Sequence, residues 1–249
     1  MPKQNGIFQL EGTLLGVSFY KTKDGYMARM KGGVTAGRIK KHPAYKRTRE
    51  NQKEFGTINT AGKLLRESLK PFTSHSSDNR VVNRITQLMA GLKNLDQTNV
   101  RGKRNVQGGL NEPGSENLLK GFNFNREAGL STVLTRPIEV DAATGVITIA
   151  GLKPEEHMTC PYEATHARIT GIQVRIDFAT GVFETIETNS AEVDVEDLVP
   201  STVVLTPVSV PSGPGIDLFL VNVHFLQEIA SVRYALKSQG NALAIVAVG

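Results

Sequence analysis

Three residues near the middle of the chain have side chains that could hold a metal ion or act as nucleophile and base: His157, Cys160 and His166. Together they offer three ligands, whereas a structural zinc site needs four. A Cys–His nucleophile needs an orienting partner and an oxyanion-binding loop, which the neighbouring sequence does not show. Cys160 is the only cysteine, which excludes an internal disulfide and a multi-thiolate metal site. We therefore predict no catalytic residue, no metal and no cofactor here.

Other motifs of the enzyme type are incomplete. Gly62-Lys63 lacks the upstream glycine and the downstream Ser or Thr of a phosphate-binding loop, and no Gly-x-Gly-x-x-Gly joins a strand to a helix. The acidic residues of the second half lack the spacing and glycine of an EF-hand. The sequence thus predicts a protein that is not an enzyme.

Charge is divided unevenly along the chain. Residues 1–104 hold 21 Lys and Arg but 7 Asp and Glu, a net charge of +14, whereas residues 105–249 carry a net charge of −9. The overall net charge of +5 therefore describes neither half. Such a chain can bind a polyanion through its basic half, or bind copies of itself head to tail.

Two groups of residues carry this division. The basic residues lie in a stretch over 31–49 that has few large apolar side chains and is predicted to be an irregular arm; they are Lys40, Lys41, Lys46, Arg47 and Arg49. The acidic residues follow one another over 184–197, and we predict that they form a face that contacts a partner; they are Glu184, Glu187, Glu192, Asp194, Glu196 and Asp197.

The elements that must position these residues differ between the two halves. Asp24-Gly25 between two strand-like runs predicts a β-hairpin in the glycine-rich start. Apolar residues at three- and four-residue spacing predict a helix over 77–96, and weaker patterns predict a helix from Thr48 that pauses at Gly56 and another over 60–70. Alternating apolar runs with turns at 141–145 and 179–181 predict about seven strands after residue 130.

These patterns predict a mainly β protein with a short helical segment. Its C-terminal part is expected to be an antiparallel β-sandwich of immunoglobulin-like or jelly-roll type, preceded by a β-hairpin, the basic arm and two to three helices. The predicted organisation is a hairpin and arm over 1–49, helices over 50–98, a polar linker over 99–117 and the sandwich over 118–249.

The first half resembles an uncharacterised protein family of Bacteroidetes bacteria, whose members pair a basic start with a variable β-rich second half. The resemblance covers roughly residues 5–105 and is carried by Val17-Ser-Phe-Tyr-Lys21, Lys23-Asp-Gly25, Lys31-Gly-Gly-Val34, Arg47-Thr-Arg-Glu-Asn51, Glu54-Phe-Gly56 and Ala61-Gly-Lys-Leu-Leu-Arg66. It implies a non-enzymatic protein capable of filament formation, and it carries over no catalytic residue.

Taken together, the sequence favours a structural subunit that self-assembles through its basic arm and strand exchange, with itself as partner. Two alternatives stay open: a nucleic-acid-binding protein that uses the same arm, and a phage-type capsid or tail component. No run of about 20 apolar residues predicts a membrane span, and no signal peptide is predicted at the start. We therefore expect a cytoplasmic protein, with surface or extracellular release left open.

Overall fold

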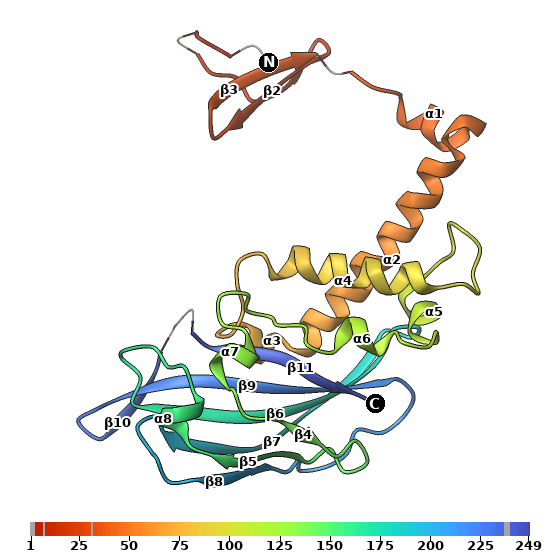
Figure 1. Ribbon diagram of the computed structural model, residues 1–249. Coiled ribbons are helices and arrows are strands. Elements are labelled where there is room, and N and C mark those ends of the chain that lie inside the picture. Colours follow the sequence, from red (N-terminus) through yellow and green to blue (C-terminus); the bar gives the residue numbers. More distant parts are fainter. Residues whose placement is uncertain (1–2, 7, 31, 237–239) are drawn as a thin grey trace. The chain divides into compact units, whose positions relative to one another are not determined.

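The computed structural model describes residues 3–6, 8–30, 32–236 and 240–249. The chain divides into two compact units, Met1–Arg49 and Glu50–Gly249 (Figure 1). The first unit contains a small sheet and short helices, and the second contains the helices and sheets that form the main core. Helix α2 begins in the first unit and continues in the second.

The sheet of the first unit has three antiparallel strands in the order β1-β2-β3; they are Gly12–Leu14, Val17–Thr22 and Gly25–Met30. Thr22 pairs with Gly25, so the hairpin predicted at Asp24-Gly25 is confirmed. The Thr22 hydroxyl donates to the Gly25 carbonyl at 2.9 Å, and Gly25 has a φ of +110°, which suits a residue without a Cβ. Short-range turn chemistry therefore sets this element.

Most of the basic stretch over 31–49 is helical, not irregular as predicted; the described residues 32–35 and His42 lie outside the helices. It contains α1 (Ala36–Lys41), the 3₁₀ turn η1 (Pro43–Tyr45) and the start of α2 (Lys46–Ser68). The Thr35 hydroxyl caps α1 by accepting from the Arg38 N–H, and Pro43 stands at the start of η1. Because Thr and Pro favour helix starts, local capping overcomes the scarcity of apolar residues.

Helix α2 runs without interruption through Gly56, whereas the sequence predicts a pause there. One helical glycine costs only about 1 kcal/mol relative to alanine. Burial of Ile58, Leu64 and Leu65 on the same helix offsets that cost. Two further helices follow, α3 (Lys70–Thr73) and α4 (Val81–Leu95), of which α4 corresponds to the helix predicted over 77–96.

The segment predicted as a linker over 99–117 contains two short helices, α5 (Val106–Leu110) and α6 (Glu116–Leu119). Buried Val106 and Leu119 join the core that is shared by the helices and the large sheet. The Gly102 N–H donates to the Glu54 carboxylate at 2.6 Å, and Lys93 pairs with the same carboxylate at 2.9 Å. This polar segment is therefore fixed to α2 through the buried Glu54 carboxylate, which Lys93 of α4 also contacts.

Two sheets make up the β part of the second unit. The five-stranded antiparallel sheet has the order β10-β9-β6-β7, and β11 also pairs with β9; the strands are β6 His166–Asp177, β7 Val182–Asp194, β9 Ile216–Ile229, β10 Val232–Ala235 and β11 Ala242–Val248. The three-stranded sheet has the order β4-β5-β8; its strands are Glu139–Val140, Ile147–Leu152 and Ser201–Leu205. Helices α7 (Leu130–Val133) and α8 (Pro154–His157) lie in the connections.

The five-stranded sheet lies between two cores (Figure 1). Helices cover one face, where Leu65, Ile85 and Leu92 pack on Ile172, Val174 and Leu220. The small sheet covers the other face, where Ile149 and Leu205 pack with Ile169 and Phe225. The Thr188–Pro207 bridge joins β7 to the segment after β8, so the sheet curls.

The mainly β composition with helices is confirmed, since more of the chain lies in strands than in helices. The immunoglobulin-like or jelly-roll sandwich is not confirmed, and what the structure shows is a curled antiparallel sheet with helices on one face. A search of the described residues finds no helix that is long and apolar enough to cross a membrane.

Candidate functional site

The basic residues singled out in the sequence lie on two helices. Lys40 and Lys41 occupy the last turn of α1, and Lys46, Arg47 and Arg49 occupy the first turn of α2. The Arg49 guanidinium donates to the Ile39 carbonyl at 2.7 Å and to the His42 carbonyl at 3.0 Å, so Arg49 holds the two helices together. Lys40, Lys41 and Lys46 are exposed and available to a partner.

The described residues of the first unit include none that is buried. Several of its large apolar side chains face solvent, with Phe8 84%, Leu14 59% and Met30 74% exposed. A small sheet needs an apolar face packed on something else for stability. Within the described residues, this unit therefore leaves apolar side chains uncovered.

The acidic residues predicted as one face are separated along β7. Glu184 lies near the start of the strand, where its carboxylate accepts from the Ser212 N–H at 3.0 Å, and Glu187 lies between the two ends. Asp194 ends the strand, and Glu196 and Asp197 follow it. Ten residues of strand span about 33 Å, so Glu184 and Asp194 cannot meet the same small patch of a partner.

Glu192 is already engaged within the chain. It pairs with Arg168 at 2.6 Å and also with Arg233, and Arg233 in turn pairs with Glu228 at 3.1 Å. The hydrogen bond from Arg168 is the largest influence that lowers the pKa of Glu192. Without Glu192, the predicted acidic residues at this end of the sheet are Asp194, Glu196 and Asp197. The Asp197 carbonyl also accepts a hydrogen bond from the backbone N–H of Glu155.

His157, Cys160 and His166, the candidate metal ligands considered in the sequence, have different local environments in the structure. Burial raises the pKa of the Cys160 thiol to about 11, so the thiol is protonated at neutral pH and is a poor nucleophile. His157 Nδ1 accepts from the Lys153 N–H at 3.0 Å, and His166 Nδ1 lies 2.9 Å from the Thr165 hydroxyl. Among the described residues, no three His, Cys, Asp or Glu side chains gather as metal ligands.

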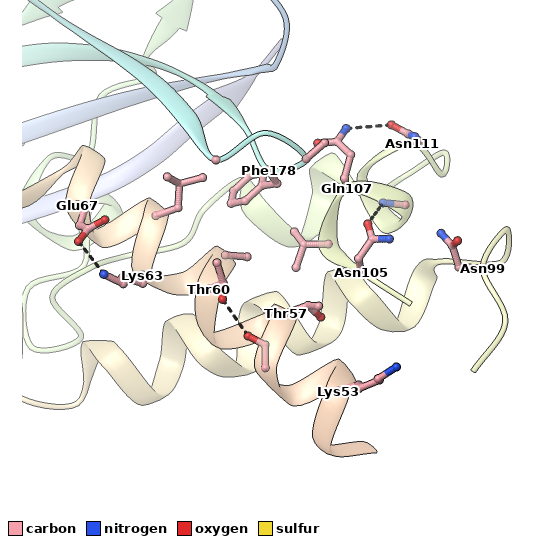
Figure 2. Close-up of a pocket in the computed structure, with 17 residues that line it drawn as sticks. Lys53, Thr57, Thr60, Lys63, Glu67, Asn99, Asn105, Gln107, Asn111 and Phe178 are labelled. Carbon is pink, nitrogen blue, oxygen red and sulfur yellow. Dashed lines mark hydrogen bonds and ion pairs between the residues drawn. The ribbon is translucent and has the colours of Figure 1, made fainter. Parts of the chain in front are cut away.

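The second unit contains an open groove of about 940 Å³ that the sequence did not reveal. Figure 2 shows the side chains that line it. One wall is α2, which contributes Lys53, Thr57, Thr60, Lys63 and Glu67. The opposite wall is the 99–111 segment, and Phe178 of the β6–β7 turn closes one side. No sequence motif marks this groove, because its walls are far apart in the chain.

The groove presents amides and hydroxyls rather than a reactive group. Gln107 Nε2 donates to Asn111 Oδ1 at 3.2 Å, and Asn105 Oδ1 accepts from the Gly108 N–H at 2.8 Å. Its one carboxylate, Glu67, lies 3.5 Å from Lys63, and its lining includes no His, Cys or Ser. Such a surface can hold an extended polar chain, but it lacks a nucleophile paired with a base.

A histidine pair lies on the helix-covered side of the large sheet. The rings of His75 and His224 stack with centroids 5.6 Å apart, and His224 is paired in register with Arg168. His224 Nε2 is buried without a hydrogen-bond partner within the described residues. Burial is the main influence that lowers the pKa of His224, with the charges of His75 and Arg168 adding to it. Only the tertiary fold brings His75 here, so sequence reasoning missed this cluster.

The lowered pKa of His224 predicts a loss of stability in mild acid. The unfolded chain takes up the proton near the usual pKa of about 6.5, whereas the folded chain resists it. The free energy of unfolding should therefore be highest above pH 6.5 and fall as the pH drops from about 7 toward 5. Urea denaturation at several pH values across this range gives the free energy of unfolding as a function of pH. This free energy should fall less steeply toward acid pH for His224→Gln than for wild type. An unchanged pH dependence of the free energy of unfolding for His224→Gln would refute the assignment.

Compared with known proteins, the chain matches no family model and shows no significant similarity to a curated protein or to a solved structure.

Proposed function

We propose that the protein is a non-enzymatic structural subunit that assembles head to tail with copies of itself into a filament or tube. The observation that supports this proposal is the exposure of the first unit. None of its described residues is buried, including those of its three-stranded sheet. A surface of one copy that binds a different surface of the next gives an open helix when the rotation does not close.

Charge supports the same pairing. Lys and Arg exceed Asp and Glu by nine in Met1–Arg49, whereas Asp and Glu exceed Lys and Arg by four in Glu50–Gly249. The exposed Lys40, Lys41 and Lys46 would approach the acidic end formed by Asp194, Glu196 and Asp197 of the next copy. Exposed ion pairs contribute only about 0–1 kcal/mol each, so charge would steer association while apolar burial and strand pairing hold it.

Nucleic-acid binding is the second candidate. Lys40, Lys41 and Lys46 are exposed on neighbouring helical turns, and Tyr45 lies among them with its ring 6.2 Å from the ring of His42. Phosphates and bases are bound by such mixtures of cations and rings. Assembly that requires added nucleic acid, or particles rich in absorbance at 260 nm, would favour this function.

Deletion of residues 1–34 tests the proposal. The deletion removes the three-stranded sheet, which has no buried residue, and leaves Thr35 to cap α1. The second unit keeps all of its core residues. We expect the full chain to elute from a sizing column as large species and to form rods in electron micrographs, and the shortened chain to elute as a folded monomer. Large species of unchanged size from the shortened chain would contradict the proposed role of the first unit.

A further inference from the structure

Strand β10 is an uncovered edge of the five-stranded sheet in the part of the chain that the structure describes. The β11 edge is bonded by the Phe122–Phe124 segment, where the Phe124 N–H donates to the Leu243 carbonyl at 2.8 Å. The β7 edge is bonded at one place to the segment after β8, where Thr188 bridges to Pro207 and the Asn189 N–H donates to the Thr206 carbonyl at 3.1 Å. Within the described residues, no hydrogen bond reaches the outer side of β10, and all four of its residues are exposed.

The register of β10 defines which backbone groups face outward. Val232 pairs with Ile229 across a two-residue turn, and the Leu236 N–H donates to the Phe225 carbonyl at 3.0 Å. Because bonded and non-bonded pairs alternate in an antiparallel ladder, the N–H and C=O groups of Val232 and Tyr234 point toward β9. Those of Arg233 and Ala235 point outward and are open to another strand.

The two faces of this edge differ in chemistry. On one face Arg233 joins Glu228 and Glu192 in ion pairs that fix the hairpin. On the other face Ile229, Val232 and Tyr234 are apolar and 54%, 50% and 55% exposed. Soluble proteins usually protect an edge strand with charge, proline or a covering loop. An open edge that carries exposed apolar side chains is a site for strand addition.

The first unit has an open edge of matching length. Strand β3 is covered on its outer side, where Lys3 bridges to Met27 and the Gln4 N–H donates to the Tyr26 carbonyl at 2.9 Å. Strand β1 has no such cover among the described residues. Leu14 pairs with Val17 across its turn, so the N–H and C=O groups of Thr13 point outward. Beside them Leu14 is 59% and Leu15 94% exposed.

We infer that β10 of one copy accepts β1 of a second copy, which joins the small basic sheet to the large sheet of its neighbour. This inference rests on the proposed self-assembly and names the surfaces that carry it. The two edges are short and open, both expose apolar side chains, and they belong to units of opposite net charge. Backbone hydrogen bonds would give strength, and contact of Leu14 and Leu15 with Val232 and Tyr234 would bury apolar area.

Proline substitution tests each edge separately. Ala235→Pro removes one outward N–H of β10, and Thr13→Pro removes one outward N–H of β1, while the ladder inside each sheet is kept. Each variant alone should elute as a monomer with wild-type circular dichroism. Ala235→Thr, which keeps the N–H, is the matched control and should assemble like wild type.

Mixing the two proline variants gives the sharpest result. The Thr13→Pro copy keeps an intact β10 and the Ala235→Pro copy keeps an intact β1, so together they should form a dimer that grows no further. Tyr234→Arg, which leaves the backbone unchanged, gives a second measurement and should slow assembly of the full chain. If all three variants assemble as the wild-type chain does, the edge assignment is wrong but self-assembly stands. If the wild-type chain itself is a monomer, both the edge assignment and the proposed function are wrong. Two folded proline variants that do not dimerise on mixing would also overturn the assignment.

Discussion

Gly109→Ala should lower the free energy of unfolding by at least about 3 kcal/mol. A Cβ at residue 109 would lie 1.8 Å from the Leu92 carbonyl oxygen and 2.6 Å from its carbon. These are backbone atoms of α4, so no side-chain rotation can relieve the clash. Helix α5 would have to move away from α4, which would open the core around Val106 and the wall of the groove. Urea denaturation followed by circular dichroism measures the loss.

Gly56→Ala is the matched control, because a Cβ at residue 56 meets nothing within 4 Å on the exposed side of α2. It should raise the free energy of unfolding by about 0.5–1 kcal/mol, since alanine favours the helix. Opposite signs for the two substitutions would show that close packing of α5 on α4, rather than helix propensity, sets the requirement at Gly109. A loss below about 1 kcal/mol at Gly109 would contradict the close approach of these helices.

Asp96→Ala should destabilise the second unit by about 3–5 kcal/mol. Asp96 is 2% exposed, and its carboxylate accepts from the backbone N–H groups of Thr98, Asn99 and Asn105 at 3.1, 2.9 and 3.0 Å. Burial opposes its ionisation, but the donors from Asn99 and Asn105 outweigh burial and lower the pKa of Asp96. Removal of the carboxylate leaves three N–H groups without an acceptor.

Hydrogen exchange locates this effect. The amides of residues 98–105 should lose protection in Asp96→Ala well before the strands of the large sheet do. Asp141→Ala is the control: Asp141 also accepts a backbone N–H, from Ala143 at 3.0 Å, but it is exposed and its loss should cost no more than about 1 kcal/mol. Similar costs at both positions would mean that burial of the Asp96 carboxylate contributes little.

Turns, helix periodicity and charge were predictable from the sequence because they depend on neighbouring residues. The hairpin at Asp24-Gly25, the turn glycines Gly145 and Gly181 with φ of +75° and +77°, and the apolar stripe of α4 follow from local backbone preference and spacing. The uneven division of charge needed only the order of the residues. The sequence also shows that the residues around Cys160 supply fewer than four metal ligands, which led to the prediction of no metal there.

The tertiary structure decided what depends on contacts between distant segments. It joined the 99–117 segment to the core through Val106 and the bond from Gly102 to Glu54. It separated Glu184 from Asp194 along β7 and stacked His75 on His224. It also left β10 as an open edge, because β10 pairs with β9 on one side and no described segment bonds to its other side. Strand order and edge exposure arise from long-range pairing, which local residue patterns do not encode, so the candidate assembly surfaces became visible only in the folded chain.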